Sequence, residues 1–121
     1  MSVPMPCETA LQSERSDPGL LAEIKESARL IDLYIHGLSL EAFDRDMLHR
    51  DATAFRLLMI GEAAIHLSDA FKARVPHLDW RGMISLRHRL AHDYGSASSL
   101  VLWTIASEDM AELRHALETL D

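Results

Sequence analysis

Apolar side chains recur every three or four residues along four stretches of the chain, which is the spacing of one face of an α-helix. The first stretch starts at Asp17, because an Asp followed by Pro18 supplies an N-cap acceptor and a preset first helical turn. Gly37 and Ser39 mark its end. Its apolar stripe consists of Leu21, Ile24, Ala28, Ile31, Ile35 and Leu38. These features predict an amphipathic helix that begins at residue 17.

Three further helices follow the same pattern. The second is predicted over 48–67, after a short helical turn over 40–46. One more helical turn is predicted over 68–74, and Asp79 is expected to cap the third helix, which ends near Gly95. The stripes are Leu48, Ala52, Phe55, Met59 and Ala63 in the second helix, Met83, Leu86 and Leu90 in the third, and Trp103, Ala106, Met110, Leu113, Leu117 and Leu120 in the fourth.

Four amphipathic helices with short connections and no alternating strand pattern indicate an all-α protein, an antiparallel four-helix bundle with one or two extra short helices. Residues 1–16 lack apolar periodicity, so we predict a disordered tail before a helical domain at 17–121. The first and fourth helices carry more apolar side chains than one seam needs, namely Leu20, Leu33, Leu100, Val101, Leu102 and Ile105. A second copy of the chain could bury this excess, so we expect a homodimer.

The composition narrows the function classes. The 121 residues are 48% hydrophobic, which is enough for one domain with one core. A formal charge of −7 argues against a protein that coats nucleic acid through a broad basic surface. Cys7 is the only cysteine, so a disulfide within one chain is excluded. Because no membrane-spanning run or secretory signal is present, we expect a soluble, cytoplasmic protein.

Positive charge and imidazole concentrate in residues 80–92, a segment without any acid. The segment holds Arg81, Arg87, His88, Arg89 and His92. Histidine can move a proton near neutral pH, and arginine presents a planar fork that suits phosphate oxygens. Together they match cleavage of RNA by its own 2′-hydroxyl, with no metal or other cofactor. His88 and His92 have a spacing that also suits zinc, but no third ligand accompanies them, so we expect no metal site.

The spacing within this segment poses a geometric problem. Arg87 and His92 are five residues apart, so on a straight helix their side chains diverge by about 140°. Two arrangements could bring them into one site. The helix could unwind between Ala91 and Gly95, or two protomers could meet across an axis and form a composite site.

Arg87, His92 and Tyr94 form the pattern R-x4-H-x-Y. With this motif and four further segments, the chain resembles the HepT-like family of the HEPN superfamily over about residues 20–120. The four segments are Ile60-Gly61-Glu62-Ala63-Ala64, Trp80-Arg81-Gly82-Met83, Val101-Leu102-Trp103 and Asp109-Met110-Ala111-Glu112-Leu113. The chain departs from the pattern at one position, since many HEPN sequences have a small polar residue, often asparagine, where this chain has His88.

The resemblance implies the toxin of a bacterial or archaeal toxin-antitoxin pair. Such a toxin is a metal-independent endoribonuclease, and here Arg87 and His92 would line a cleft between two protomers as its catalytic residues. The resemblance also implies a partner, a minimal nucleotidyltransferase antitoxin of the MntA type. This antitoxin would silence the toxin by attaching AMP to the motif tyrosine, Tyr94.

Three further residues are expected to support the motif, namely His88, Glu62 and Asp93. Glu62 interrupts the apolar run 59–65, and it either faces the motif or lies on a solvated edge. Tyr94 either packs its ring on the bundle, or accepts AMP, or does both. A second function also stays open: a non-catalytic adaptor or substrate-binding subunit that docks a nucleotidyltransferase through the same basic patch.

Overall fold

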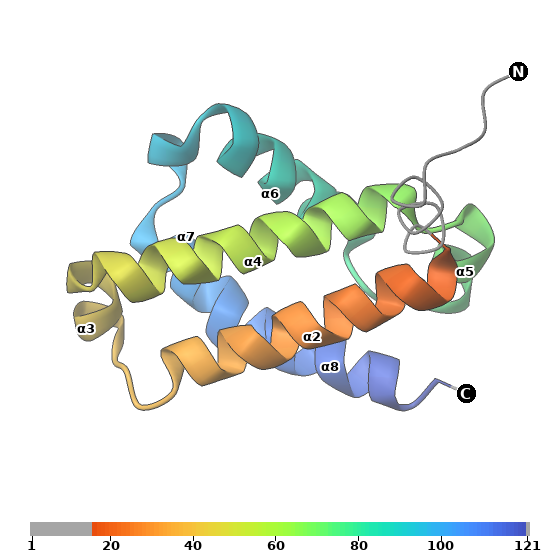
Figure 1. Ribbon diagram of the computed structural model, residues 1–121, viewed down its shortest axis with the longest axis horizontal. Coiled ribbons are helices and arrows are strands. Elements are labelled where there is room, and N and C mark those ends of the chain that lie inside the picture. Colours follow the sequence, from red (N-terminus) through yellow and green to blue (C-terminus); the bar gives the residue numbers. More distant parts are fainter. Residues whose placement is uncertain (1–15, 121) are drawn as a thin grey trace, which may run out of the picture.

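The computed structural model describes residues 16–120, and every regular element in that range is a helix (Figure 1). The helices are α2 (Asp17–Ile35), α3 (Leu40–Arg45), α4 (Met47–His66), α5 (Asp69–Arg74), α6 (Trp80–His92), α7 (Ser99–Thr104) and α8 (Met110–Glu118), with a 3₁₀ turn, η1 (Tyr94–Ser96), and a π-helical turn, η2 (Ile105–Asp109). The predicted all-α class is confirmed, as are the short helices at 40–46 and 68–74. The predicted tail, 1–16, lies outside the described residues apart from Ser16.

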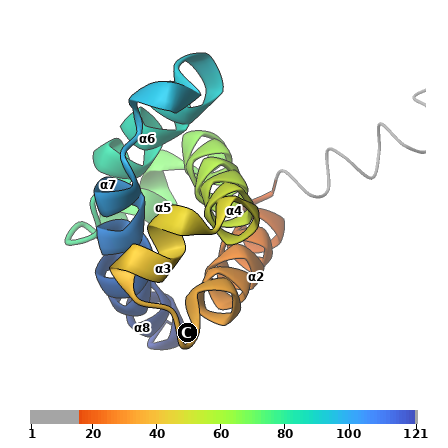
Figure 2. The same cartoon turned by 90° about the vertical axis from the view of Figure 1, so that its left-hand side faces the viewer.

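The long helix α4 forms the centre of the molecule. Figures 1 and 2 show α2 running antiparallel along one side of α4 and α6 packed on the other, with α8 beside α2. Most of the large, fully buried aliphatic side chains come from α2, α4, α7 and α8, among them Ile24, Ile31, Ile60, Leu102, Leu113 and Leu117. Each contributes roughly 1.5–3 kcal/mol by leaving water. Helix α6 fully buries Trp80 and Leu90, packs Met83, Ile84 and Leu86 against the core as half-buried side chains, and leaves its opposite face exposed.

The buried face of α4 is not the one that the apolar stripe predicted. Leu48 and Phe55 are 76% and 54% exposed, so their predicted place in the core was wrong. Of the predicted stripe, Ala63 is fully buried, and the helix also buries Thr53, Ala54, Leu57, Ile60, Gly61 and Ala64. A helix that is apolar around most of its circumference offers more than one candidate face, and periodicity alone does not choose between them. The structure therefore leaves an apolar stripe of α4 facing outward.

The C-terminal seam was predicted correctly, with Ala106, Met110, Leu113 and Leu117 all buried. It is divided between α7 and α8 by the π-helical turn η2, which the sequence did not indicate. Two residues of the predicted apolar excess, Leu20 and Leu102, are 3% and 1% exposed, so they belong to the core of one chain. Three others remain exposed, namely Leu33, Leu100 and Val101.

The helix ends follow local chemistry. The carboxylate of Asp79 accepts a hydrogen bond from the Gly82 amide at 2.9 Å, as predicted for the N-cap of α6. The N-cap of α2 is Ser16 rather than Asp17, whose carboxylate instead accepts hydrogen bonds from Ser68. Within residues 16–120, no helix is long and apolar enough to cross a bilayer.

Candidate active site

Helices α4 and α6 approach each other closely at Gly61. A Cβ atom at this position would lie 2.4 Å from Cβ of Arg87 and 2.6 Å from the carbonyl oxygen of Met83. Both distances are shorter than non-bonded atoms tolerate, so only a residue without a side chain fits there. The close approach puts the next residue of α4, Glu62, within reach of the Arg87 guanidinium.

Glu62 holds Arg87 by an ion pair. The Arg87 Nε donates to Glu62 Oε2 at 2.8 Å, and the other carboxylate oxygen of Glu62 lies 3.3 Å from His66 Nε2. Partial burial acts to raise the pKa of Glu62, but the hydrogen bonds from His66 and Arg87 and the charge of Arg87 outweigh it and lower that pKa. Glu62 is therefore ionised at neutral pH and fixes the orientation of the guanidinium.

Two histidines continue this contact toward the end of α6. The Arg87 Nη1 lies 3.3 Å from His88 Nδ1. Because a guanidinium only donates hydrogen bonds, Nδ1 of His88 is the acceptor in this contact. The rings of His88 and His92 are stacked, with centroids 6.4 Å apart and planes 14° apart. The polar groups thus form a line from Glu62 to His92.

Helix α6 stays helical through His92, and the backbone leaves the helix at Asp93 (φ −151, ψ 63). The chain therefore unwinds within the stretch 91–95 suggested by the sequence, but only after His92. The change does not turn His92 toward Arg87. Among residues 16–120 of one protomer, the two motif side chains are linked only through His88, and the composite site between two protomers stays a prediction.

Asp93, expected to support the motif, contributes through its backbone. Its amide donates to the Arg89 carbonyl at 2.7 Å, and its carbonyl accepts the Ser96 hydroxyl at 2.8 Å. These contacts end α6 and start η1. Within residues 16–120 the Asp93 carboxylate makes no hydrogen bond or ion pair. In the same range, no three His, Cys, Asp or Glu side chains gather closely enough to hold a metal ion.

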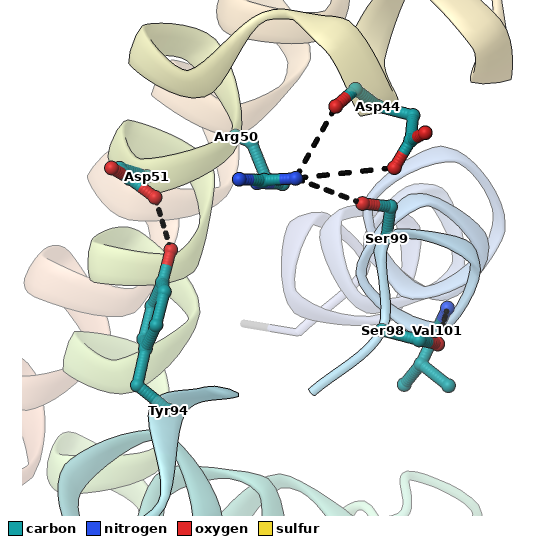
Figure 3. A network of polar contacts seen from close by, with 7 residues as sticks. All are labelled: Asp44, Arg50, Asp51, Tyr94, Ser98, Ser99 and Val101. Carbon is teal, nitrogen blue, oxygen red and sulfur yellow. Dashed lines mark hydrogen bonds and ion pairs between the residues drawn. The ribbon is translucent and has the colours of Figure 1, made fainter. Parts of the chain in front are cut away.

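The motif tyrosine is tied back to α4. Figure 3 shows the Tyr94 hydroxyl donating a hydrogen bond to the carboxylate of Asp51. Burial, followed by the hydrogen bond to Asp51 and its charge, raises the pKa of the Tyr94 phenol to about 12. The side chain is 44% exposed, so the ring borders the solvent and is not part of the core.

The neighbour of Asp51 on α4 makes a second connection. Arg50 Nη1 donates to the Ser99 hydroxyl at 3.3 Å and to the Asp44 carbonyl at 3.2 Å (Figure 3). Sequence reasoning missed both Arg50 and Asp51. A signal for Asp51 was present, because it interrupts the apolar stripe of Leu48 and Phe55 in the way that Glu62 interrupts a later apolar run.

Comparison with known proteins identifies the family of this chain. A family model described as Ribonuclease HepT-like matches residues 24–120. The chain belongs to the ribonuclease HepT-like family. The HepT-like region contains every side chain of the site described above, from Arg50 to Ser99.

Two relatives align with this chain over almost their whole length. “Probable ribonuclease HepT” from Thermococcus cleftensis is 32% identical over 107 residues, covering 88% of this chain and 97% of the relative. “Putative RNase MJ1380” from Methanocaldococcus jannaschii is 28% identical over 106 residues, with the same coverage of 88% and 97%. No solved structure matches significantly. The names of both relatives describe a ribonuclease.

Proposed function

We propose that this protein is an endoribonuclease and the toxin of a toxin-antitoxin pair. The observation that carries the proposal is the line of polar groups in which Glu62 holds the Arg87 guanidinium beside two imidazoles. His92 lies at the exposed C-terminal end of α6, where a polynucleotide can reach it. Membership of a family described as ribonuclease agrees with this reading.

The proposed reaction uses the RNA's own nucleophile. His92 accepts the proton of a 2′-hydroxyl, whose oxygen attacks the adjacent phosphorus while the 5′-oxygen leaves and takes up a proton. Arg87 binds the phosphate oxygens and stabilises the charge that builds up on them. Glu62 and His88 position Arg87, since Nε and Nη1 are engaged by these two residues and Nη2 makes no hydrogen bond or ion pair within residues 16–120. The reaction needs no metal ion.

The proposal includes a homodimer. Seven large apolar side chains are exposed in residues 16–120, and six of them belong to α4 or to residues 94–101. These six are Met47, Leu48, Phe55, Tyr94, Leu100 and Val101. The two segments are adjacent, because Tyr94 contacts Asp51 and Ser99 contacts Arg50. A second copy packed on this surface would cover Met47, Leu48, Phe55, Leu100 and Val101, leave Tyr94 at the rim of the interface, and bring the ends of two α6 helices together, which would complete the composite site.

We further propose that Tyr94 is the acceptor through which a partner nucleotidyltransferase silences the protein with AMP. The exposed phenol supports this assignment, because a partner enzyme can reach it. Its position two residues after His92 also supports it, since a nucleotide attached there would occupy the surface that RNA must approach. An added phosphate would repel an RNA phosphate over this short distance.

RNA cleavage by single-residue variants tests the proposal. Arg87→Ala and His92→Ala should each lower the cleavage rate by about 10²–10⁴-fold, in buffer containing EDTA. Arg89→Ala is the matched control, because Arg89 is an exposed arginine on the same helix outside the line from Glu62 to His92. Unchanged cleavage by both motif variants would overturn the assignment.

A second candidate function is a non-catalytic adaptor that docks a nucleotidyltransferase. The exposed apolar side chains around Tyr94 favour it, because they could bind a partner protein instead of a second copy. Activity separates the two candidates. If the purified protein cuts no RNA in the presence or absence of the partner, yet binds the nucleotidyltransferase tightly, the protein is an adaptor and not a nuclease.

A further inference from the structure

The hydroxyl of Tyr94 is held in one place although its ring is nearly half exposed. The hydroxyl of a surface tyrosine usually forms hydrogen bonds with water, so it needs no protein partner. Here the hydroxyl donates to the carboxylate of Asp51, which lies 43 residues earlier in the chain and on a different helix. The contact therefore gives a reactive oxygen a fixed position and a neighbouring acceptor for its proton.

The segment that carries Tyr94 is attached to α4 at both of its ends. Asp51 binds Tyr94 at the start of the segment, and Arg50 binds Ser99 at its end (Figure 3). Only Nη1 of Arg50 is engaged in these contacts, so its remaining donors stay available within the described range. The positive charge of Arg50 also acts on the Tyr94 phenol, whose ionised form it favours. The Asp51 carboxylate thus contacts the Tyr94 hydroxyl directly, and the charge of Arg50 acts on the same phenol from the neighbouring position of α4.

We propose that Asp51 is the proton-accepting residue for nucleotidyl transfer to Tyr94, and that this chain, rather than the transferase alone, supplies part of the chemistry of its own modification. The inference rests on the proposed modification of Tyr94 and adds to it a residue on the acceptor side. Arg50 supplies a positive charge beside the incoming phosphate.

ATP bound to the partner enzyme supplies the nucleotide. The Tyr94 oxygen attacks the α-phosphorus, and a phosphorus–oxygen bond to the phenol forms. The bond between the α-phosphorus and the bridging oxygen to the β-phosphate breaks, and pyrophosphate leaves with the electron pair. The proton of the Tyr94 hydroxyl passes to the Asp51 carboxylate and from there to solvent. No oxidant or reductant is involved.

An acceptor for this proton is needed because the free phenolate is scarce. With a pKa raised to about 12 by burial and by Asp51, on the order of one molecule in 10⁵ carries an ionised Tyr94 at neutral pH. A phenol that must wait for spontaneous ionisation is a poor nucleophile. Removal of the proton during the attack avoids that penalty, and general-base assistance is worth about 10²–10⁴-fold.

The test measures label transfer from α-phosphate-labelled ATP to the full-length protein by a purified minimal nucleotidyltransferase of the class proposed as its partner. Asp51→Asn should lower the rate of labelling by about 100-fold or more, whereas Asp51→Glu should restore part of it. Asp69→Asn is the matched control, since α5 lies at the opposite end of α4 from Asp51 (Figure 1). Intact-mass spectra then locate the added mass on Tyr94.

A structural role would not change the pH profile, so labelling is followed from pH 6 to pH 10. Asp51→Asn should gain rate steeply with rising pH, because hydroxide replaces the lost acceptor. If Asp51→Asn is labelled as fast as the wild type, Asp51 is not the acceptor, although modification of Tyr94 stands. If the wild type takes up no label at all, both this inference and the proposed regulation by AMP are overturned, while RNA cleavage remains a separate question.

Discussion

Gly61 of α4 lies directly against the side chain of Arg87 on α6. A Cβ atom on Gly61 would be 2.4 Å from Cβ of Arg87 and 2.6 Å from the Met83 backbone oxygen. The backbone of α6 would have to move to admit it. Gly61→Ala should therefore lower the free energy of unfolding by about 1–3 kcal/mol, measured by urea denaturation. The same shift separates Arg87 from Glu62, so RNA cleavage should fall by at least about tenfold.

Gly95→Ala serves as the control for this substitution. A Cβ atom on Gly95 would meet nothing within 4 Å, and its φ is not positive. The change should alter the free energy of unfolding by less than about 0.5 kcal/mol. Equal stability of the two variants would mean that α4 and α6 are not packed as closely in solution as the structure describes.

Much of this site could be predicted, because its residues occur in a short run with a fixed order. The residues Arg87, His88 and His92 stood out as a basic segment of an acidic chain, and Glu62 stood out as one charge in an apolar run. The prediction that could not be made was the contact between Tyr94 and Asp51. It joins positions 43 residues apart, and no periodicity within either helix reports on a pairing between them.

The face of α4 was mispredicted for a different physical reason. Leu48 and Phe55 are larger than Ala54, Gly61 and Ala64, so hydrophobicity favoured the wrong stripe. The small residues are buried because α2 and α6 approach α4 from two sides, and only short side chains fit between closely packed helices. The large residues are left outside one chain, where a second copy can cover them.

The ionised state of Glu62 leads to a prediction on pH. Its pKa is lowered from the ordinary value of 4.5, so its contribution to stability is present above that value and is lost as the pH falls through the lowered pKa. Glu62→Gln keeps the shape and removes the charge. At pH 7 it should be less stable than the wild type by up to about 1 kcal/mol, since the carboxylate is partly exposed.

This difference should shrink as the pH falls below about 4, where the wild-type carboxyl is protonated as well. Chemical denaturation at a series of pH values measures it. Glu118→Gln, an exposed glutamate at the end of α8, provides the comparison. A stability gap that persisted unchanged at low pH would mean that the charge of Glu62 does not stabilise the fold.

The exposed stripe of α4 leads to a prediction on assembly. The double variant Leu48→Asp and Phe55→Asp should be monomeric, because two carboxylates would have to be buried in a homodimer formed through this face. Leu33→Asp, at a residue that is 61% exposed on α2, should leave the dimer intact. Sedimentation velocity over a range of concentrations distinguishes monomer from dimer. If the Leu33→Asp variant alone dissociates into monomers, the dimer interface lies on α2 instead of α4.

Tyr94→Phe tests whether the contact with Asp51 persists in solution without any partner enzyme. The substitution removes only the hydroxyl, and with it a hydrogen bond to a charged acceptor. The turn η1 then keeps its own backbone bonds, Ser96 to Asp93 and Ala97 to Tyr94, but loses its attachment to α4. Amide hydrogen exchange at positions 96 and 97 should accelerate by about tenfold. Tyr34→Phe on α2 should leave these amides unchanged, and equal protection in both variants would mean that Arg50 and Ser99 alone hold the segment.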